Sequence, residues 1–242
     1  MPLRHISSSA AVSLLLSLET SSSLCSVALH RLADGHLLGQ SELRLDKSHS
    51  SHLTVLIEQL VGNTGHALKD LAAVALSDGP GSYTGLRIGA AAAKGLCFAL
   101  DIPLLAVGSL WALAAQVRAV TALPEQFLFV PMLDARRQEV YTATYRADGS
   151  EVAPPTPLIL TPEALTEPAG PLRRLCFGSG AAKFAALAAG RDDLVFLPNI
   201  EASAVAVGAL ALVAHQQKAF ENVAYYEPFY LKDVYTTTPR AA

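Results

Sequence analysis

Hydrophobic and polar positions change their spacing several times along the first half of the chain. Short apolar or alternating runs are typical of β-strands, and they cover residues 12–18, 24–31, 37–45, 72–77 and 104–107. Apolar residues that recur every 3.6 positions are typical of amphipathic helices, and they cover residues 50–62, 86–100 and 109–120. Ser109 is the expected cap of the last helix. The predicted element order is βββαβαβα.

The second half repeats this order with less contrast. Its predicted strands cover residues 127–133, 139–146, 152–160, 173–178 and 194–197. Its predicted helices cover residues 162–167, 180–189 and 202–218. Two copies of one βββαβαβα unit predict a duplicated α/β fold with mixed sheets and a cleft between the lobes. This order is similar to that of the actin, sugar-kinase and Hsp70-like (ASKHA) superfamily, which is built from two ribonuclease-H-like domains.

Four parts of the chain follow from this reading. They are a disordered leader (1–10), an N-terminal ribonuclease-H-like lobe (11–108), a smaller C-terminal lobe (109–220) and a tail (221–242). The aromatic start of the tail is expected to pack back on the body, and its last ten residues are expected to fray. The apolar run that follows the leader has no convincing small-x-small cleavage site, so we interpret it as a buried strand rather than a secretory signal.

Composition limits the function classes. The chain has 242 residues, of which 51% are hydrophobic and only 16% charged. A surface so poor in charge indicates a face covered by a partner, unless coding bias produced the composition. A net charge of −3 argues against this chain holding nucleic acid by itself. Three scattered cysteines exclude a disulfide framework and a thiolate zinc site, and they predict a cytoplasmic protein. No apolar run is long enough to span a membrane.

A glycine-rich loop separates the strand at 72–77 from the helix at 86–100. Its residues are Gly79, Pro80, Gly81, Ser82, Tyr83, Thr84 and Gly85. The loop lacks the lysine of a P-loop and the third glycine of a Rossmann motif, and Ser82 is not in a G-x-S-x-G elbow. Three interpretations stay open, namely a structural turn that caps the next helix, an anion or ligand site, and a partner contact.

The helix that follows is rich in alanine and glycine. It is expected to pack on the sheet through Leu86, Ala90, Ala93 and Cys97, which would leave the opposite face smooth. Gly89 and Gly95 lower helix stability by about 1 kcal/mol each relative to alanine. They therefore indicate close approach of another backbone, although a tightly buried internal helix is the alternative.

Other candidate sites are weaker. Glu19 ends the first strand, where ASKHA proteins carry an acid near a metal and phosphate site, but it could instead cap the following turn. His49 and His52 are three residues apart without a third ligand nearby, so we expect an exposed helix start rather than a metal pair. The Gly178–Gly180 segment is either a second phosphate loop or an ordinary turn, and the latter is favoured. The charged residues at 134–139 predict a solvent-exposed hairpin end.

A resemblance to a known family rests on several of these motifs together. They are GPGSYTGLRIG (79–89), AKGL (93–96), LETS (18–21), His49, DAR…EVY (134–141) and YEPFYL (226–231). Along the chain these motifs follow the order that they have in the TsaB (YeaZ) family, and across residues 14–232 the chain resembles that family. These proteins are non-catalytic dimerisation subunits of the bacterial machinery that makes tRNA threonylcarbamoyladenosine (t6A).

The resemblance implies the following expectations. The chain would bind TsaD directly, while TsaD transfers threonylcarbamoyl to N6 of adenosine 37 and the ATPase TsaE cycles the complex. tRNA would be reached only through the complex, and the chain alone could form a homodimer. No catalytic residue, metal or cofactor is expected, although a weak or interfacial nucleotide stays open, with Glu19 as a degenerate phosphate or metal position. The expected interface residues on the two helices are His49, His52, Arg87, Ala91, Ala92 and Gly95.

The alternative function is a stand-alone enzyme of the same fold, either ATP-dependent or a metallo-glycopeptidase. Such an enzyme needs a first-strand acid that holds a metal, a nucleotide-binding second half and a catalytic base. Only Glu19 and the Gly178–Gly180 segment point in that direction.

Overall fold

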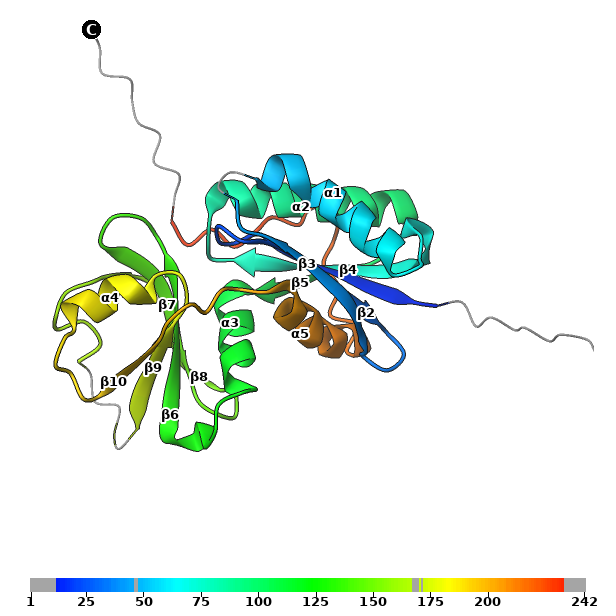
Figure 1. The fold of residues 1–242 in the computed structure, drawn as a ribbon. Helices are drawn as coiled ribbons and strands as arrows, with labels where there is room; N and C mark the ends of the chain where they lie inside the picture. The colour runs from blue at the N-terminus through cyan, green and yellow to red at the C-terminus, as the bar shows by residue number, and fades with distance from the viewer. Residues whose placement is uncertain (1–11, 46–47, 167–169, 171, 233–242) are drawn as a thin grey trace, which may run out of the picture.

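The computed structural model describes residues 12–45, 48–166, 170 and 172–232. Two lobes lie side by side, and each contains a five-stranded mixed sheet (Figure 1). The expected leader, residues 1–10, lies outside the described residues, and so do the last ten residues of the chain.

The first sheet has the strand order β3-β2-β1-β4-β5. Its strands are β1 (Leu14–Glu19), β2 (Cys25–Arg31), β3 (Leu37–Leu43), β4 (Leu71–Gly79) and β5 (Leu104–Gly108). β2 runs antiparallel to β1 and β3, while β4 lies parallel to both β1 and β5. Every residue of β1 is buried, which explains its nearly continuous apolar sequence.

The second sheet repeats the same topology, with the order β10-β9-β6-β7-β8. Its strands are β6 (Phe127–Asp134), β7 (Glu139–Tyr145), β8 (Glu151–Ile159), β9 (Arg173–Phe177) and β10 (Leu194–Leu197). β6 takes the place of β1, with an antiparallel neighbour on one side and a parallel neighbour on the other. The duplicated α/β architecture that the sequence predicts is therefore confirmed.

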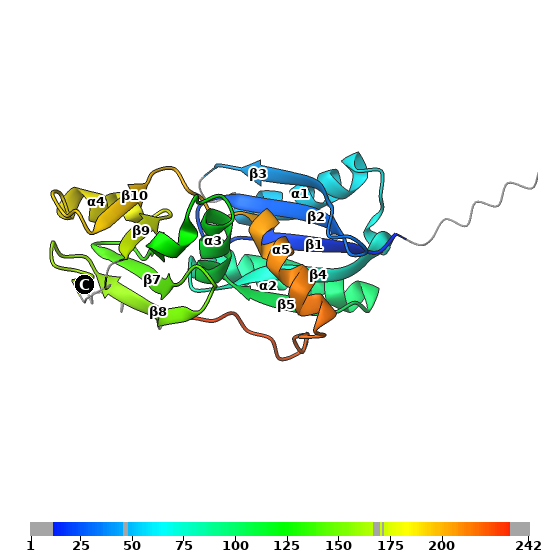
Figure 2. The ribbon, with the colours of Figure 1, turned by 90° about the horizontal axis from the view of Figure 1, so that it is seen from below.

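Helices cover both faces of the first sheet (Figures 1 and 2). The α-helices are α1 (His49–Asn63), α2 (Tyr83–Leu100), α3 (Ser109–Arg118), α4 (Ala181–Leu187) and α5 (Ala204–Gln216), and the 3₁₀ turns are η1 (Leu68–Asp70) and η2 (Pro124–Gln126). α1 and α2 pack next to each other on one face. α3 contacts β6 and β7 of the second sheet and also touches α5.

α5 packs on the first lobe, although the sequence groups it with the second. It contacts β1, β2, β4 and β5, and buries Val207 and Ala211 against that sheet (Figure 2). A Cβ atom at Gly208 would overlap the ring of His30, so glycine is what lets this helix lie so close. The four-part division of the chain stays a prediction. The first lobe is not made only of the first half of the sequence, because α5 from the second half packs on its sheet.

Two predicted helix starts are corrected by the structure. Gly108, not Ser109, occupies the cap position of α3, because the Ser109 hydroxyl instead accepts a hydrogen bond from the Gly79 amide at 3.0 Å. α2 begins three residues earlier than expected, at Tyr83. The Ser82 hydroxyl caps it by accepting from the Gly85 amide.

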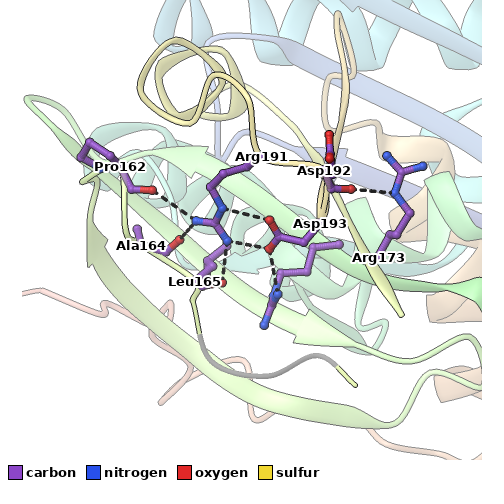
Figure 3. A network of polar contacts seen from close by, with 8 residues as sticks. Pro162, Ala164, Leu165, Arg173, Arg191, Asp192 and Asp193 are labelled. Carbon is purple, nitrogen blue, oxygen red and sulfur yellow. Dashed lines mark hydrogen bonds and ion pairs between the residues drawn. The ribbon is translucent and has the colours of Figure 1, made fainter. Parts of the chain in front are cut away.

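The predicted helix at 162–167 does not form in its described part, residues 162–166. The Arg191 guanidinium donates to the carbonyl oxygens of Pro162, Ala164 and Leu165 at 3.3, 2.6 and 3.0 Å (Figure 3). Asp193 holds that guanidinium in place through a 2.6 Å ion pair. Leu165 also has φ +59°, outside the helical region. Carbonyls that a helix would use internally are thus bound by an arginine far along the chain.

Candidate functional site

The glycines at the start of α2 are required by packing within the chain. A Cβ atom at Gly81 would overlap the carbonyl oxygen of Ser21, and one at Gly85 would overlap that of Thr20. One turn further, a Cβ at Gly89 would overlap the Thr20 hydroxyl. The Ser82 amide also donates to the Ser21 carbonyl at 2.7 Å. The first turns of α2 therefore lie directly on the end of β1, which favours the structural interpretation of the glycine loop.

The described part of the tail closes over the other side of this loop. The Tyr226 hydroxyl donates to Asp78 at 2.8 Å, and the Phe229 amide donates to the Asp78 carbonyl at 2.9 Å. Gly79 has φ +120°, and a Cβ there would overlap the Phe229 carbonyl. Lys94 of α2 donates to two further tail carbonyls. The sequence showed that the tail is aromatic. It did not show that the tail binds Asp78, because Tyr226 and Asp78 are 148 residues apart.

Glu19 is fully buried at the end of β1. Its Oε1 accepts a hydrogen bond from the Ser21 amide at 2.6 Å, while Oε2 has no hydrogen-bond partner among the described residues. Burial raises the pKa of this carboxyl. The arrangement is that of an acid that caps its own turn, which favours the structural alternative. In the described part of the chain, no three His, Cys, Asp or Glu side chains gather in a way that could hold a metal ion.

The two histidines at the head of α1 are not exposed as expected. His49 is buried, its Nε2 has no hydrogen-bond partner within the part of the chain that the structure describes, and burial lowers its pKa. The expectation of an exposed helix start is therefore wrong for His49. His52 is half-buried, and its Nδ1 lies 2.8 Å from the Ser51 hydroxyl and 3.3 Å from the Ser48 carbonyl.

The outer side of α2 differs from its inner side in the way the sequence predicts. The residues expected to face the sheet, namely Leu86, Ala90, Ala93 and Cys97, are all buried. Arg87, Ala91 and Gly95 are exposed, and Ala92 is half-buried. Phe98 is 85% exposed. A Cβ atom at Gly95 would meet nothing within 4 Å, so nothing described in the chain requires glycine there.

We use the name α1–α2 face for the exposed residues of these two neighbouring helices. On α2 they include Arg87, Ala91, Gly95 and Phe98, and on α1 they include Val55, which is 41% exposed. The face carries little charge, and its exposed large apolar side chains include Val55 and Phe98. Such a surface suits the close approach of another helix.

A cleft of about 780 Å³ lies between the lobes, beside the glycine loop. Its wall includes Ser21, His49 and Arg136. The Gly178–Gly180 turn borders it, and the Ser179 hydroxyl there accepts from the Asp134 amide at 3.1 Å. A Cβ at Gly178 would overlap the Met132 carbonyl. This turn therefore packs on the end of β6 as the first glycine loop packs on β1, which favours the ordinary-turn interpretation.

The cysteines carry no reactive thiol at these sites. Cys25, Cys97 and Cys176 are all buried and free of disulfide bonds. Burial raises the pKa to about 11 for Cys25 and Cys97, and to about 12 for Cys176. None of the helices in the described ranges is both long and apolar enough to cross a membrane.

The repeated strand order and the cleft between the lobes define an α/β protein of the duplicated actin-like (ASKHA) class. A family model described as "TsaD: tRNA N6-adenosine threonylcarbamoyltransferase" matches residues 43–234. The chain belongs to this family, and within it the relatives described next make it a member of the TsaB (YeaZ) family.

Three relatives carry this assignment. The structure of YeaZ from Pseudomonas aeruginosa superimposes with a TM-score of 0.75 at 27% identity, and covers 90% of this chain and 100% of that one. The tRNA threonylcarbamoyladenosine biosynthesis proteins TsaB of Haemophilus influenzae and Bacillus subtilis are 38% and 37% identical over 127 and 132 residues. Those alignments cover 52% and 54% of this chain, and the chain spans about half the length of each curated relative, 51% and 55%.

Proposed function

We propose that the chain is a non-catalytic subunit that binds a TsaD-type transferase through the α1–α2 face. In this role it would hold the transferase in a competent arrangement for threonylcarbamoyl transfer to N6 of adenosine 37 in tRNA. TsaE would be the ATPase of the same assembly. The names of the curated relatives support a place in t6A biosynthesis.

The main support for this binding surface is the open space beside Gly95 on α2. A glycine inside a helix lowers stability by about 1 kcal/mol relative to alanine. Gly81, Gly85 and Gly89 have an internal reason, because the end of β1 occupies the space beside them. Among the described residues, nothing lies within 4 Å of a Cβ atom at Gly95, and the exposed Phe98 follows three positions later on the same helix. A closely packed partner helix would account for both residues.

The burial of Glu19 supports a non-catalytic role. A metal-binding or nucleophilic carboxylate has to reach solvent or a ligand, whereas Glu19 is sealed within the fold and binds its own turn. The stand-alone enzyme would need this residue. Nucleotide hydrolysis by the isolated chain that is abolished by Glu19→Gln would therefore overturn the proposal.

Reconstitution tests the proposed role. The isolated chain should show no threonylcarbamoyl transfer, and adding it to TsaD, TsaE and threonylcarbamoyl-adenylate should restore transfer to tRNA. Ala91→Arg should abolish this restoration, because a bulky charged side chain would block the exposed face of α2. The matched control is Ala209→Arg, an exposed alanine of α5, the helix on the opposite side of the first sheet from α1 and α2 (Figure 2). Equal activity of the two variants would contradict the proposed surface.

A further inference from the structure

The hairpin between β6 and β7 has no part in the proposed subunit contact, yet it borders a second pocket, which shares Asp134 and Arg136 with the cleft between the lobes. The pocket has a volume of about 410 Å³ and lies between the hairpin, the start of α2 and the tail. Arg136, Arg137 and Tyr141 line one side, and Tyr83 and Lys232 line the others.

The two acidic side chains of this pocket are each paired with a lysine. Lys183 lies 2.6 Å from Asp134, and Lys232 pairs with Glu139. In the described part of the chain, neither the Arg136 nor the Arg137 guanidinium has an ion pair or a side-chain hydrogen bond. The four cations and two acids leave two uncompensated positive charges, in a chain whose net charge is −3.

The backbone presents both arginines at the tip of the turn. Arg136 has φ +66° and Arg137 has φ +51°, which places two consecutive non-glycine residues in the left-handed region. Both side chains are exposed. The Arg136 amide is fixed by the Asp134 carboxylate at 2.6 Å, so the turn is held while the guanidinium groups stay available.

Exposed aromatic rings flank these charges. The Tyr83 and Tyr230 rings have centroids 5.0 Å apart and are 36% and 37% exposed. Arg87 donates to the Tyr83 hydroxyl at 2.7 Å and has no acidic partner in the described ranges. Cations that follow a backbone and aromatic rings that stack on bases are the combination by which proteins bind single-stranded nucleic acid.

We propose that this pocket binds a single-stranded segment of RNA, with a phosphate at Arg136 and Arg137 and a base against the Tyr83–Tyr230 pair. The inference deepens the proposed function, because it gives the subunit its own contact with the RNA substrate of the assembly. The rings are exposed at the surface rather than enclosed, which favours a passing strand over a free nucleotide. Since the whole chain is acidic, the affinity of the isolated chain is expected to be weak, with Kd on the order of 100 µM.

Fluorescence anisotropy with a labelled single-stranded RNA oligonucleotide and the full chain at low salt tests the proposal. Arg136→Gln combined with Arg137→Gln should weaken binding at least tenfold, and should lower the slope of log Kd against log salt by about 0.7 for one lost phosphate contact. Tyr83→Leu should weaken binding by about tenfold through lost stacking. Thermal melting and far-UV circular dichroism report whether the variants are folded.

A control with the same change in net charge separates a site from bulk electrostatics. Lys69→Gln combined with Arg146→Gln removes two exposed cations, one before β4 and one after β7, at the strand ends opposite to the pocket. This control should bind RNA within twofold of the unsubstituted chain. The proposal is overturned if control and pocket variants lose affinity equally, if the unsubstituted chain binds no RNA, or if ADP displaces the oligonucleotide at equal concentration.

Co-elution of the same protein variants with TsaD tests the RNA proposal independently of the subunit proposal. Arg136→Gln combined with Arg137→Gln should still allow co-elution with TsaD, because both arginines lie outside the α1–α2 face. If the unsubstituted chain fails to bind TsaD, the subunit proposal fails while the RNA measurement keeps its meaning. If Arg136→Gln combined with Arg137→Gln abolishes TsaD binding, the hairpin is a protein contact and the RNA proposal is wrong.

Discussion

The two halves of α2 use small residues for opposite purposes. In the first half, Tyr83–Ala90, the Thr20 carbonyl and hydroxyl occupy the space where Cβ atoms at Gly85 and Gly89 would lie. In the second half, Ala91–Leu100, nothing lies within 4 Å of a Cβ placed at Gly95, and Phe98 is exposed. The same residue type therefore reports internal packing in one half and an open surface in the other. A glycine motif by itself does not distinguish these two cases.

The largest expected effect is a loss of stability on substitution in the first half of α2. Gly85→Ala would bring a Cβ atom into the Thr20 carbonyl, and backbone cannot move aside as a flexible side chain can. We expect a loss of about 3 kcal/mol or more in the free energy of unfolding, measured by urea denaturation. Gly62→Ala is the control, because Gly62 lies in the neighbouring helix with open space beside it. Equal stability of the two variants would show that α2 does not rest on β1 as described.

The next effect concerns the tail that covers the first half. Tyr226→Phe removes the hydroxyl that donates to Asp78 and leaves the ring in the core. The expected loss is about 1.5 kcal/mol. Tyr225→Phe serves as the control, since Tyr225 is 85% exposed. Unchanged stability of Tyr226→Phe, measured by thermal melting, would mean that the tail contributes little to holding the glycine loop.

A third effect appears only in acid. Burial lowers the pKa of His49, which borders the first half of α2, so the folded state takes up this proton less readily than the unfolded state. The stability that comes from burying neutral His49 is therefore fully present above about pH 6.5. It is lost progressively as the pH falls below that value, because the unfolded state then binds the proton first. His49→Gln should reduce the fall in melting temperature between pH 7 and pH 5, whereas substitution of the exposed His36 should not. An unaltered pH profile would contradict a buried, neutral His49.

The smallest effect is on the second half. Gly95→Ala should be tolerated and should stabilise the isolated chain by up to about 1 kcal/mol, because helix propensity improves and nothing is displaced. Chemical denaturation of the isolated chain measures this. A loss of stability would show that Gly95 has an internal role after all, and would remove the main reason to treat it as a contact residue.

The sequence predicted those parts of the fold that local patterns determine. Buried strands such as β1 read as apolar runs, and the inner face of α2 followed from helical spacing. The sequence did not predict those local structures that depend on contacts between distant segments. Arg191 binds the carbonyls at 162–165 and prevents a helix there. Gly208 lets α5 cross to the other lobe, and the burial of His49 depends on packing that no spacing reveals.

One part of the candidate site could likewise be predicted from the sequence and another part could not. The α2 surface could be proposed from composition, because glycine and alanine at every face are visible in the sequence. The hairpin pocket could not, because its wall combines the start of α2, the β6–β7 turn and Lys232 of the tail. Only the fold shows that lysines already pair with both acids there, and that within the described residues the Arg136 and Arg137 guanidinium groups have no ion pair.

The affinity of the chain for TsaD, measured by isothermal titration calorimetry with Gly95→Arg and Ala209→Arg variants, tests the central claim most directly. If the open half of α2 is the contact, Gly95→Arg should weaken binding by at least 100-fold without lowering the melting temperature, and Ala209→Arg should bind like the unsubstituted chain. Equal affinity of all three proteins would contradict a subunit contact through this face.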